Sequence, residues 1–192
     1  MTTPTGRLVP SPDDRGTDAL AWERTFRAPV EDVWAAVTEP DRLARWIGTW
    51  TGDPTDGFVT FTMTAEDDAE PARYDIRTCE PPRLLEVDAV DDFGAWYLGL
   101  RLSESDDVTT LTMTQVINDV AAVENTGPGW EYYLDRLLAA ETSGDVDGVD
   151  WDDYYPAMRP YYVALAERLQ PGIGATLDGD ADASPTTDEG RA

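Results

Sequence analysis

APVEDVWAAVTEPDRLARWIGTW (residues 28–50) carries three tryptophans and the spacing of two short helices. The apolar positions of its first half recur at i, i+3, i+4 and i+7, as on one face of an amphipathic helix: Val30, Val33, Trp34 and Val37. Pro40 favours the start of a second short helix, which Gly48 ends. The stretch therefore predicts a helix pair, and it raises the question of whether its tryptophans are core or the wall of a binding site.

The residues on either side of this helix pair alternate between apolar and polar, as strands do. On the N-terminal side, one face of a half-buried strand would carry Leu20, Trp22, Arg24 and Phe26. On the C-terminal side, about residues 56–118 contain five runs of period two: GFVTFTMTA, ARYDIRTCE, RLLEVDAV, AWYLGLRLSE and DVTTLTMTQVIN. Short connections between successive strands predict an antiparallel meander.

Two helices are predicted after the strands. TGPGWEYYLDRLLAAE (residues 126–141) carries an apolar stripe at helical spacing, with Thr126 as its N-cap. An extra C-terminal helix begins near residue 159, because Pro160 would break a helix interior. A sheet cannot bury its own face, so we expect an α+β fold in which a curved antiparallel sheet wraps around the long helix. The helix pair would close one end of the space between them.

Both ends of the chain lack apolar periodicity. We expect a disordered arm over residues 1–18 and a disordered acidic tail over residues 171–192. Between them, residues 19–142 would form one domain. Residues 143–170 would add an acidic loop and the extra helix, packed on that domain.

The charge and composition of the chain exclude several classes of function. Asp and Glu number 39, the 14 basic residues are all arginine, and the net charge is −25. Such a surface repels phosphates, so nucleic acid is not an expected partner, and no apolar run is long enough for membrane insertion. Histidine is absent, which excludes His-based catalytic triads and His-ligated metals. A single cysteine, Cys79, and the lack of a signal peptide favour a cytoplasmic location.

Two acidic segments have the spacing of calcium-binding loops. Residues 145–153 would place Tyr154 where the bidentate glutamate belongs, and residues 178–189 place Ala183 where the loop glycine belongs. We interpret both as solvated acidic segments. The sequence therefore predicts no metal site, and it indicates no cofactor.

The order of elements resembles the START-like (SRPBCC) superfamily, and within it the bacterial relatives of the activator of Hsp90 ATPase. The resemblance rests on FRAPVEDVWAAVTEPDRLARWIG (residues 26–48), which is similar to the family's first strand and helix pair. It also rests on GPGWEYYLDRLLAAE (residues 127–141), which is similar to the family's C-terminal helix. The resemblance implies a helix-grip (Bet v 1-like) fold with an internal, largely apolar cavity between sheet and long helix. Members bind hydrophobic molecules, some cyclise polyketides and some assist a chaperone.

We expect this cavity to bind a small hydrophobic or aromatic molecule without chemistry. The residues expected to contact the ligand are Trp46, Phe61, Trp96, Leu98, Met113, Gln115, Trp130, Tyr133, Leu134 and Leu137. Gln115 or a tyrosine hydroxyl would orient the ligand. For every tryptophan, ordinary core packing is the competing interpretation. Trp34 is assigned to the core, and Trp50 remains unassigned.

Two other functions stay open at this point. A polyketide cyclase-like enzyme could replace histidine with an inward polar residue; the candidates are Gln115, Tyr74, Tyr133, Arg24 and Arg101. A chaperone-linked or homodimeric interaction protein would instead expose an aromatic patch around Trp151, Tyr154 and Tyr155.

Overall fold

Residues 2–12, 16, 18–66, 70–91, 94–142 and 144–169 are described by the computed structural model. The strands are β1 (Arg7–Pro10), β2 (Asp18–Phe26), β3 (Thr49–Thr51), β4 (Phe58–Thr62), β5 (Ala72–Glu80), β6 (Leu84–Asp91), β7 (Gly94–Ser105) and β8 (Val108–Val116). The helices are α1 (Val30–Thr38), α2 (Pro40–Leu43), α3 (Val123–Thr142) and α4 (Arg159–Glu167), with short 3-10 turns η1 (Pro54–Asp56), η2 (Val120–Ala122) and η3 (Trp151–Asp153). The predicted disordered tail, residues 171–192, lies outside the described residues.

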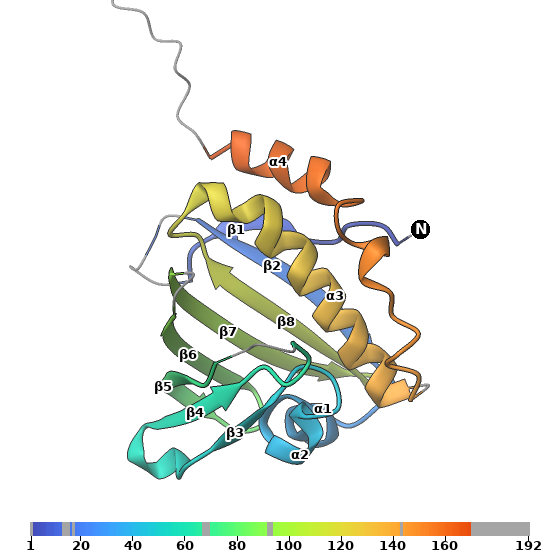
Figure 1. The fold of residues 1–192 in the computed structure, drawn as a ribbon. Coiled ribbons are helices and arrows are strands. Elements are labelled where there is room, and N and C mark those ends of the chain that lie inside the picture. The colour runs from blue at the N-terminus through green and yellow to red at the C-terminus, as the bar shows by residue number, and fades with distance from the viewer. Residues whose placement is uncertain are drawn as a thin grey trace, which may run out of the picture.

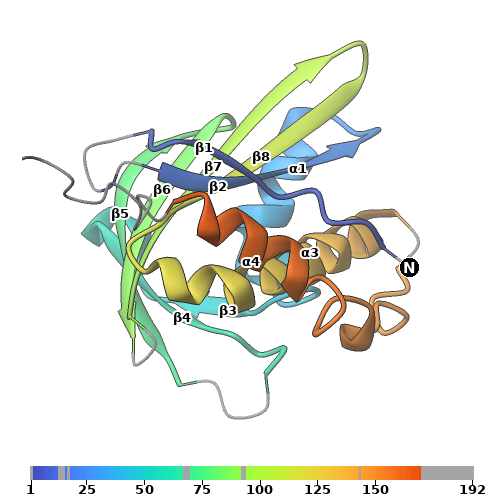
Figure 2. The same ribbon diagram turned by 90° about the horizontal axis from the view of Figure 1, so that it is seen from above.

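Within the described ranges, eight strands form one antiparallel sheet in the order β1-β2-β8-β7-β6-β5-β4-β3. The sheet curves around α3, which crosses its concave face, while α1 and α2 lie at one end (Figure 1). Helix α4 packs on α3, as the view from above shows (Figure 2). The α+β class and the layer arrangement predicted from the sequence are confirmed.

The helix boundaries agree with the sequence for α1 and for the start of α4, whereas α2 ends at Leu43, earlier than the predicted end at Gly48, and α3 also differs. The pair α1 and α2 occupies the predicted stretch, and α4 starts at Arg159 as Pro160 required. Helix α3 begins earlier than predicted, at Val123, so Thr126 lies inside the helix and is not its N-cap. The physical reason lies upstream, where the Asp119 side chain accepts a hydrogen bond from the Ala121 N–H and starts the turn η2, which continues directly into α3.

The N-terminal residues correct the expectation of a disordered arm. Residues Arg7–Pro10 form β1, which pairs with β2 and places Leu8 opposite Leu20. Just before this strand, the main-chain N–H groups of Thr5 and Gly6 donate hydrogen bonds to the Glu131 carboxylate on α3. Thr5 and Glu131 are 126 residues apart. Local periodicity could not reveal that the chain is ordered here, because the residue that holds the segment before β1 is distant in the sequence.

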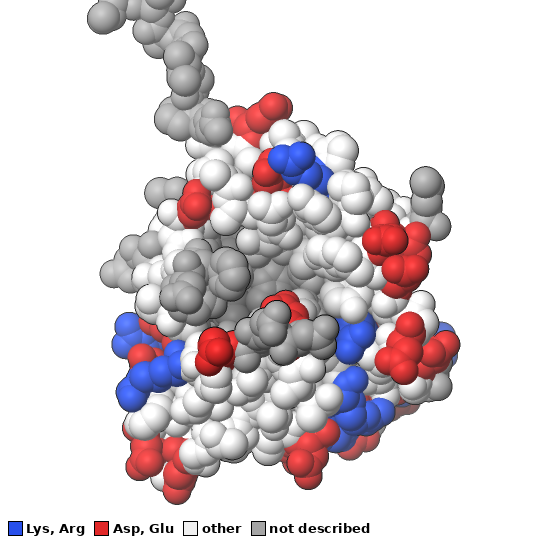
Figure 3. Space-filling view, viewed as in Figure 1, with Lys and Arg blue, Asp and Glu red and all other residues white. Residues whose placement is uncertain are grey.

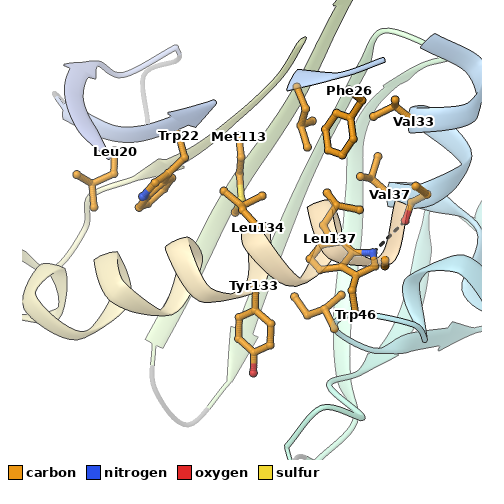
Figure 4. Close-up of a cluster of buried hydrophobic side chains, with 14 of the residues drawn as sticks. Leu20, Trp22, Phe26, Val33, Val37, Trp46, Met113, Tyr133, Leu134 and Leu137 are labelled. Atoms are coloured by element: carbon orange, nitrogen blue, oxygen red, sulfur yellow. Dashed lines mark hydrogen bonds between the residues drawn. The ribbon is translucent and has the colours of Figure 1, made fainter. Parts of the chain in front are cut away.

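The apolar core fills only one part of the space under the sheet. Trp22 and Phe26 of β2, together with Leu134 of α3, are at most 2% exposed and belong to one buried cluster that extends to the helix pair (Figure 4). In contrast, Tyr74 and Ile76 of β5 and Trp96 and Leu98 of β7 are half-buried, although they belong to the same sheet. Half-buried residues on the concave face of a sheet indicate that the described part of the protein does not fill the space in front of them.

Candidate ligand-binding cavity

The space between the sheet and α3 contains a cavity of about 1530 Å³. Its wall is built from α1, α2, strands β3 to β8 and the inner side of α3, with the half-exposed Trp151 at the rim. Figure 3 shows the surface hollowed on the face that Figure 1 presents. Typical small-molecule sites measure roughly 300–1,000 Å³. The volume is therefore sufficient for a molecule of several rings.

Most of the residues predicted to contact a ligand do line this cavity. They are Trp46, Phe61, Trp96, Leu98, Met113, Trp130, Tyr133 and Leu134. Trp96 and Leu98 face inward because alternate residues of a strand share one face, and Leu100 continues the same row. The alternation and the helical stripe were the signals that located these residues.

Strand β5 needs one irregularity to complete its part of the wall. Its register with β6 shifts between Ile76 and Thr78, as at a β-bulge. The extra residue turns Cys79, opposite Leu85, onto the cavity face, where simple alternation would have placed Thr78. Sequence periodicity does not reveal such a shift, and Cys79 was missed for that reason.

Two predicted contact residues, Leu137 and Gln115, do not line the cavity. Leu137 is fully buried, because the C-terminal half of α3 packs against the helix pair near Val37 and Trp46 (Figure 4). Gln115 lies outside the wall, and its Oε1 accepts a hydrogen bond of 2.6 Å from the Trp130 indole. Gln115 thus fixes the orientation of a wall residue.

The three tryptophans of residues 28–50 all line the cavity, which answers the question that this stretch raised. Trp34 was assigned to the core and is instead a half-buried wall residue. The indole of Trp46 donates to the Ala36 carbonyl at 3.0 Å, and that of Trp50 donates to the Thr38 carbonyl at 2.8 Å. These bonds hold both rings against α1 and leave their apolar faces for the cavity.

Trp96 differs from Trp46 and Trp50 in the hydrogen bonding of its indole nitrogen. Its indole nitrogen is buried, and no hydrogen-bond partner for it exists among the described residues. A buried N–H without a partner costs roughly 1–3 kcal/mol. This donor is one place where a ligand oxygen or a water would lower the free energy of the site.

Tyr133 brings a polar group to the inner side of α3. Its hydroxyl donates to Glu66 Oε1 at 2.7 Å, and both residues line the cavity. Burial raises the pKa of Tyr133 well above its usual range, and the hydrogen bond to the Glu66 carboxylate raises it further. The phenol is therefore held neutral, as a hydrogen-bond donor.

The other candidate polar residues are placed differently. Tyr74 lines the cavity, with its ring 5.2 Å from that of Phe61. Arg24 does not reach the cavity, because its guanidinium pairs with Glu131 and Asp135 at 2.8 Å each. Arg101 is exposed. The wall thus contains tyrosines but neither of the candidate arginines.

The predicted exposed aromatic patch is only partly exposed. Trp151 is 39% exposed, stacks on Tyr155 with 5.7 Å between ring centroids, and meets Tyr132 edge-on at 5.2 Å. Tyr154 is buried and donates to Asp135 at 2.7 Å. Trp151 thus lies at the rim of the cavity, and Tyr154 does not contribute to an exposed patch.

The acidic segment at residues 145–153 uses its carboxylates within local turns. Asp145 accepts a hydrogen bond from the Gly148 N–H, and Asp150 accepts one from the Asp152 N–H. Among the residues that the structure describes, no group of three or more carboxylates, cysteines or histidines is placed to hold a metal ion. The second acidic segment, residues 178–189, lies outside those residues. In the same ranges, no helix has the length and apolar character needed to cross a bilayer.

A curved antiparallel sheet that grips a long helix defines the helix-grip, START-like class of proteins. The chain belongs to one family of this class, described as Activator of Hsp90 ATPase homolog 1-like protein, whose model matches residues 27–141. The match covers both stretches on which the resemblance rested, apart from Phe26. No curated protein matches the chain.

Solved structures agree with this assignment. The crystal structure of CalU16 from Micromonospora echinospora has 27% sequence identity and a TM-score of 0.66, and the match covers 86% of this chain and 99% of CalU16. EF2215 from Enterococcus faecalis, a conserved protein of unknown function, has 17% identity and a TM-score of 0.62 over 86% of this chain and 92% of its own. At that identity, the second likeness shows the fold alone.

Proposed function

We propose that this protein binds a hydrophobic, aromatic small molecule in the cavity between the sheet and α3, and does no chemistry on it. The single observation that carries the proposal is the cavity of about 1530 Å³ with its largely aromatic and aliphatic wall. A folded chain ordinarily packs its interior to crystal-like density and leaves few voids larger than a water molecule. A void of this size is therefore better explained as a binding site than as a packing fault.

Apolar burial would supply most of the affinity. Each Å² of apolar surface removed from water contributes roughly 25 cal/mol. The wall tryptophans present this surface in fixed orientations, because the indoles of Trp46, Trp50 and Trp130 are held by hydrogen bonds. A preformed wall reduces the entropy lost on binding, which favours affinity. The Tyr133 hydroxyl and the Trp96 indole N–H are the groups expected to orient the ligand.

The polar groups of the wall favour binding over catalysis. A cyclase-like reaction needs an acid or a positive charge beside the atom where negative charge develops. The pKa of Tyr133 is raised by burial and by its bond to Glu66, so this phenol is a poor proton donor. Arg24 is committed to its ion pairs with Glu131 and Asp135. These observations support a ligand-binding protein over an enzyme.

Gly129 offers a direct test, because it lines the cavity and a side chain added there would meet open space. We expect wild-type protein to bind the neutral fluorescent probe N-phenyl-1-naphthylamine in a saturable manner. Gly129→Trp should weaken this binding by roughly fivefold or more, because the new ring would clash with the probe. Titration of probe fluorescence, checked by calorimetry, measures both affinities.

The matched control is Ala164→Trp, which adds the same side chain at an exposed position on α4. It should bind the probe as the wild type does. Absence of saturable binding to the wild type, or equal affinity in the two tryptophan variants, would refute the proposed function. Native mass spectrometry of protein purified from its own cells would show a retained ligand as added mass.

A further inference from the structure

The charged residues in the wall of the cavity are of one sign. Within the described part of the chain, they are Glu39, Glu66 and Glu70. We propose that the cavity selects hydrophobic molecules that carry a positive charge, such as aromatic amines, over neutral molecules and most strongly over anions. This proposal rests on the proposed function and specifies the chemical class of its ligand.

Glu66 is the best placed of these carboxylates to receive a cation. It is held by the hydroxyl of Tyr133, which bonds to Oε1, while no described residue donates to its Oε2. That oxygen remains available to an ammonium group, and charge-assisted hydrogen bonds are roughly twice as strong as neutral ones. Glu66 also lies at the exposed margin of the cavity, so a bound amine would keep contact with water.

The positive charges on nearby helices are directed elsewhere. Arg42 and Arg45 both pair with Glu141. Arg136 donates to the Trp46 carbonyl at 2.8 Å and to the Tyr132 hydroxyl at 3.2 Å, and none of these three arginines lines the cavity. An anionic ligand would therefore find no free guanidinium in the described wall. It would also meet three carboxylates.

The aromatic wall favours the same ligand class. Aromatic faces attract cations through the ring quadrupole, and tryptophan does so most strongly. The rings of Trp130 and Tyr133 lie 6.4 Å apart on α3, beside the carboxylate of Glu66. The net charge of −25 adds a long-range field that raises the local concentration of cations. Apolar faces next to carboxylates thus suit an amine on a ring system.

Three probes that share one ring system test this selectivity: 9-aminomethylanthracene (positive), anthracene-9-methanol (neutral) and anthracene-9-carboxylate (negative). We expect affinity to fall in that order, with about a tenfold difference between amine and carboxylate at low salt. The difference should shrink at about 500 mM salt, because the three carboxylates are exposed and their field is screened. Fluorescence titration of each probe gives the dissociation constants.

A pair of double variants separates the cavity from the overall charge. Glu39→Gln with Glu66→Gln should reduce the amine-to-carboxylate ratio to about threefold or less. The control, Glu31→Gln with Glu167→Gln, removes two exposed carboxylates that do not line the cavity and should leave the ratio unchanged.

The outcomes distinguish this proposal from the proposed function. Equal affinity for the three probes, or an equal loss of selectivity in both double variants, overturns the selectivity while leaving hydrophobic binding intact. If none of the three probes binds, both proposals fail.

Discussion

The two sides of α3 are built in opposite ways, and two glycines in the same turn show the difference. A Cβ added at Gly127 would lie 2.1 Å from Cδ1 of Tyr162, so that side of the helix is in direct contact with α4. A Cβ added at Gly129 would meet nothing within 4 Å, because that residue faces the cavity. One side of the helix holds the fold together, and the other leaves room for a ligand.

The side of α3 that packs against α4, called here the packed side, is centred on the fully buried Glu131. Its carboxylate accepts hydrogen bonds from Arg24 at 2.8 Å, from the Tyr162 hydroxyl, and from the main-chain N–H groups of Thr5 and Gly6. One side chain thereby joins β2, α4 and the N-terminal segment to α3. The cavity side has no comparable network among its described residues, and we infer that the stability of the fold resides mainly in the packed side.

Replacing Glu131 should have the largest effect on stability. Glu131→Ala removes one of the two carboxylate partners of the buried Arg24 and leaves the Thr5 and Gly6 N–H groups without their acceptor, so the free energy of unfolding should fall by about 3–5 kcal/mol. Glu66→Ala on the cavity side removes one hydrogen bond at an exposed residue and should cost about 1 kcal/mol. Urea unfolding followed by circular dichroism compares the two. Similar losses in both variants would show that the two sides of α3 contribute equally to the free energy of unfolding.

The glycine pair should respond to the same substitution with opposite signs. Gly127→Ala forces the added methyl group against the Tyr162 ring and should destabilise the protein by about 1–3 kcal/mol. Gly129→Ala improves helix propensity in open space and should stabilise it by up to about 1 kcal/mol. Thermal unfolding of both variants gives the two signs. Equal effects would mean that the cavity side is as tightly packed as the α4 side.

The smallest effect should be on the pH dependence of stability in acid, through the carboxyl group of Glu131. Burial alone would raise the pKa of Glu131, but the hydrogen bonds from Tyr162, Arg24 and the Thr5 and Gly6 N–H groups outweigh it and hold the pKa below its usual range. Its contribution to stability is therefore complete above the ordinary glutamate pKa of about 4.3 and is lost as the pH falls through the lower folded-state pKa.

A charge-free variant isolates this acid dependence. Glu131→Gln should unfold with a shallower dependence on pH below about 4.3, since it has no proton to take up at this position. Chemical unfolding over a pH series measures the slope. An unchanged slope would assign the acid sensitivity to other carboxylates.

Local patterns in the sequence were sufficient for much of the fold and part of the wall. The alternation at Trp96 and Leu98 and the helical stripe through Trp130 and Tyr133 located inward residues correctly, because side-chain direction follows from strand and helix periods. Where a long-range contact overrides the local pattern, the prediction was wrong. Leu137 continues the stripe on α3, yet the helix pair covers it.

The same limit explains the features that sequence reasoning missed. The segment before β1 is held by the Glu131 carboxylate, 126 residues from Thr5, and Cys79 turns inward through a shift in strand register. Trp34 shares a stripe with core valines but lies at its edge, where the wall begins. Periodicity alone does not distinguish these cases, because each depends on which other part of the chain packs next to the residue.

By itself, the sequence determined the order of the helix pair, the central strands and the long helix, the inward face of strands such as β7, the acidic character of the molecule and the exclusion of histidine chemistry. These depend on residue type and on short-range period, which are local properties. Only the tertiary structure decided which inward residues pack against each other and which face empty space. That division depends on the curvature of the sheet, the position of the helix pair and the network around Glu131. All three are set by contacts between distant segments.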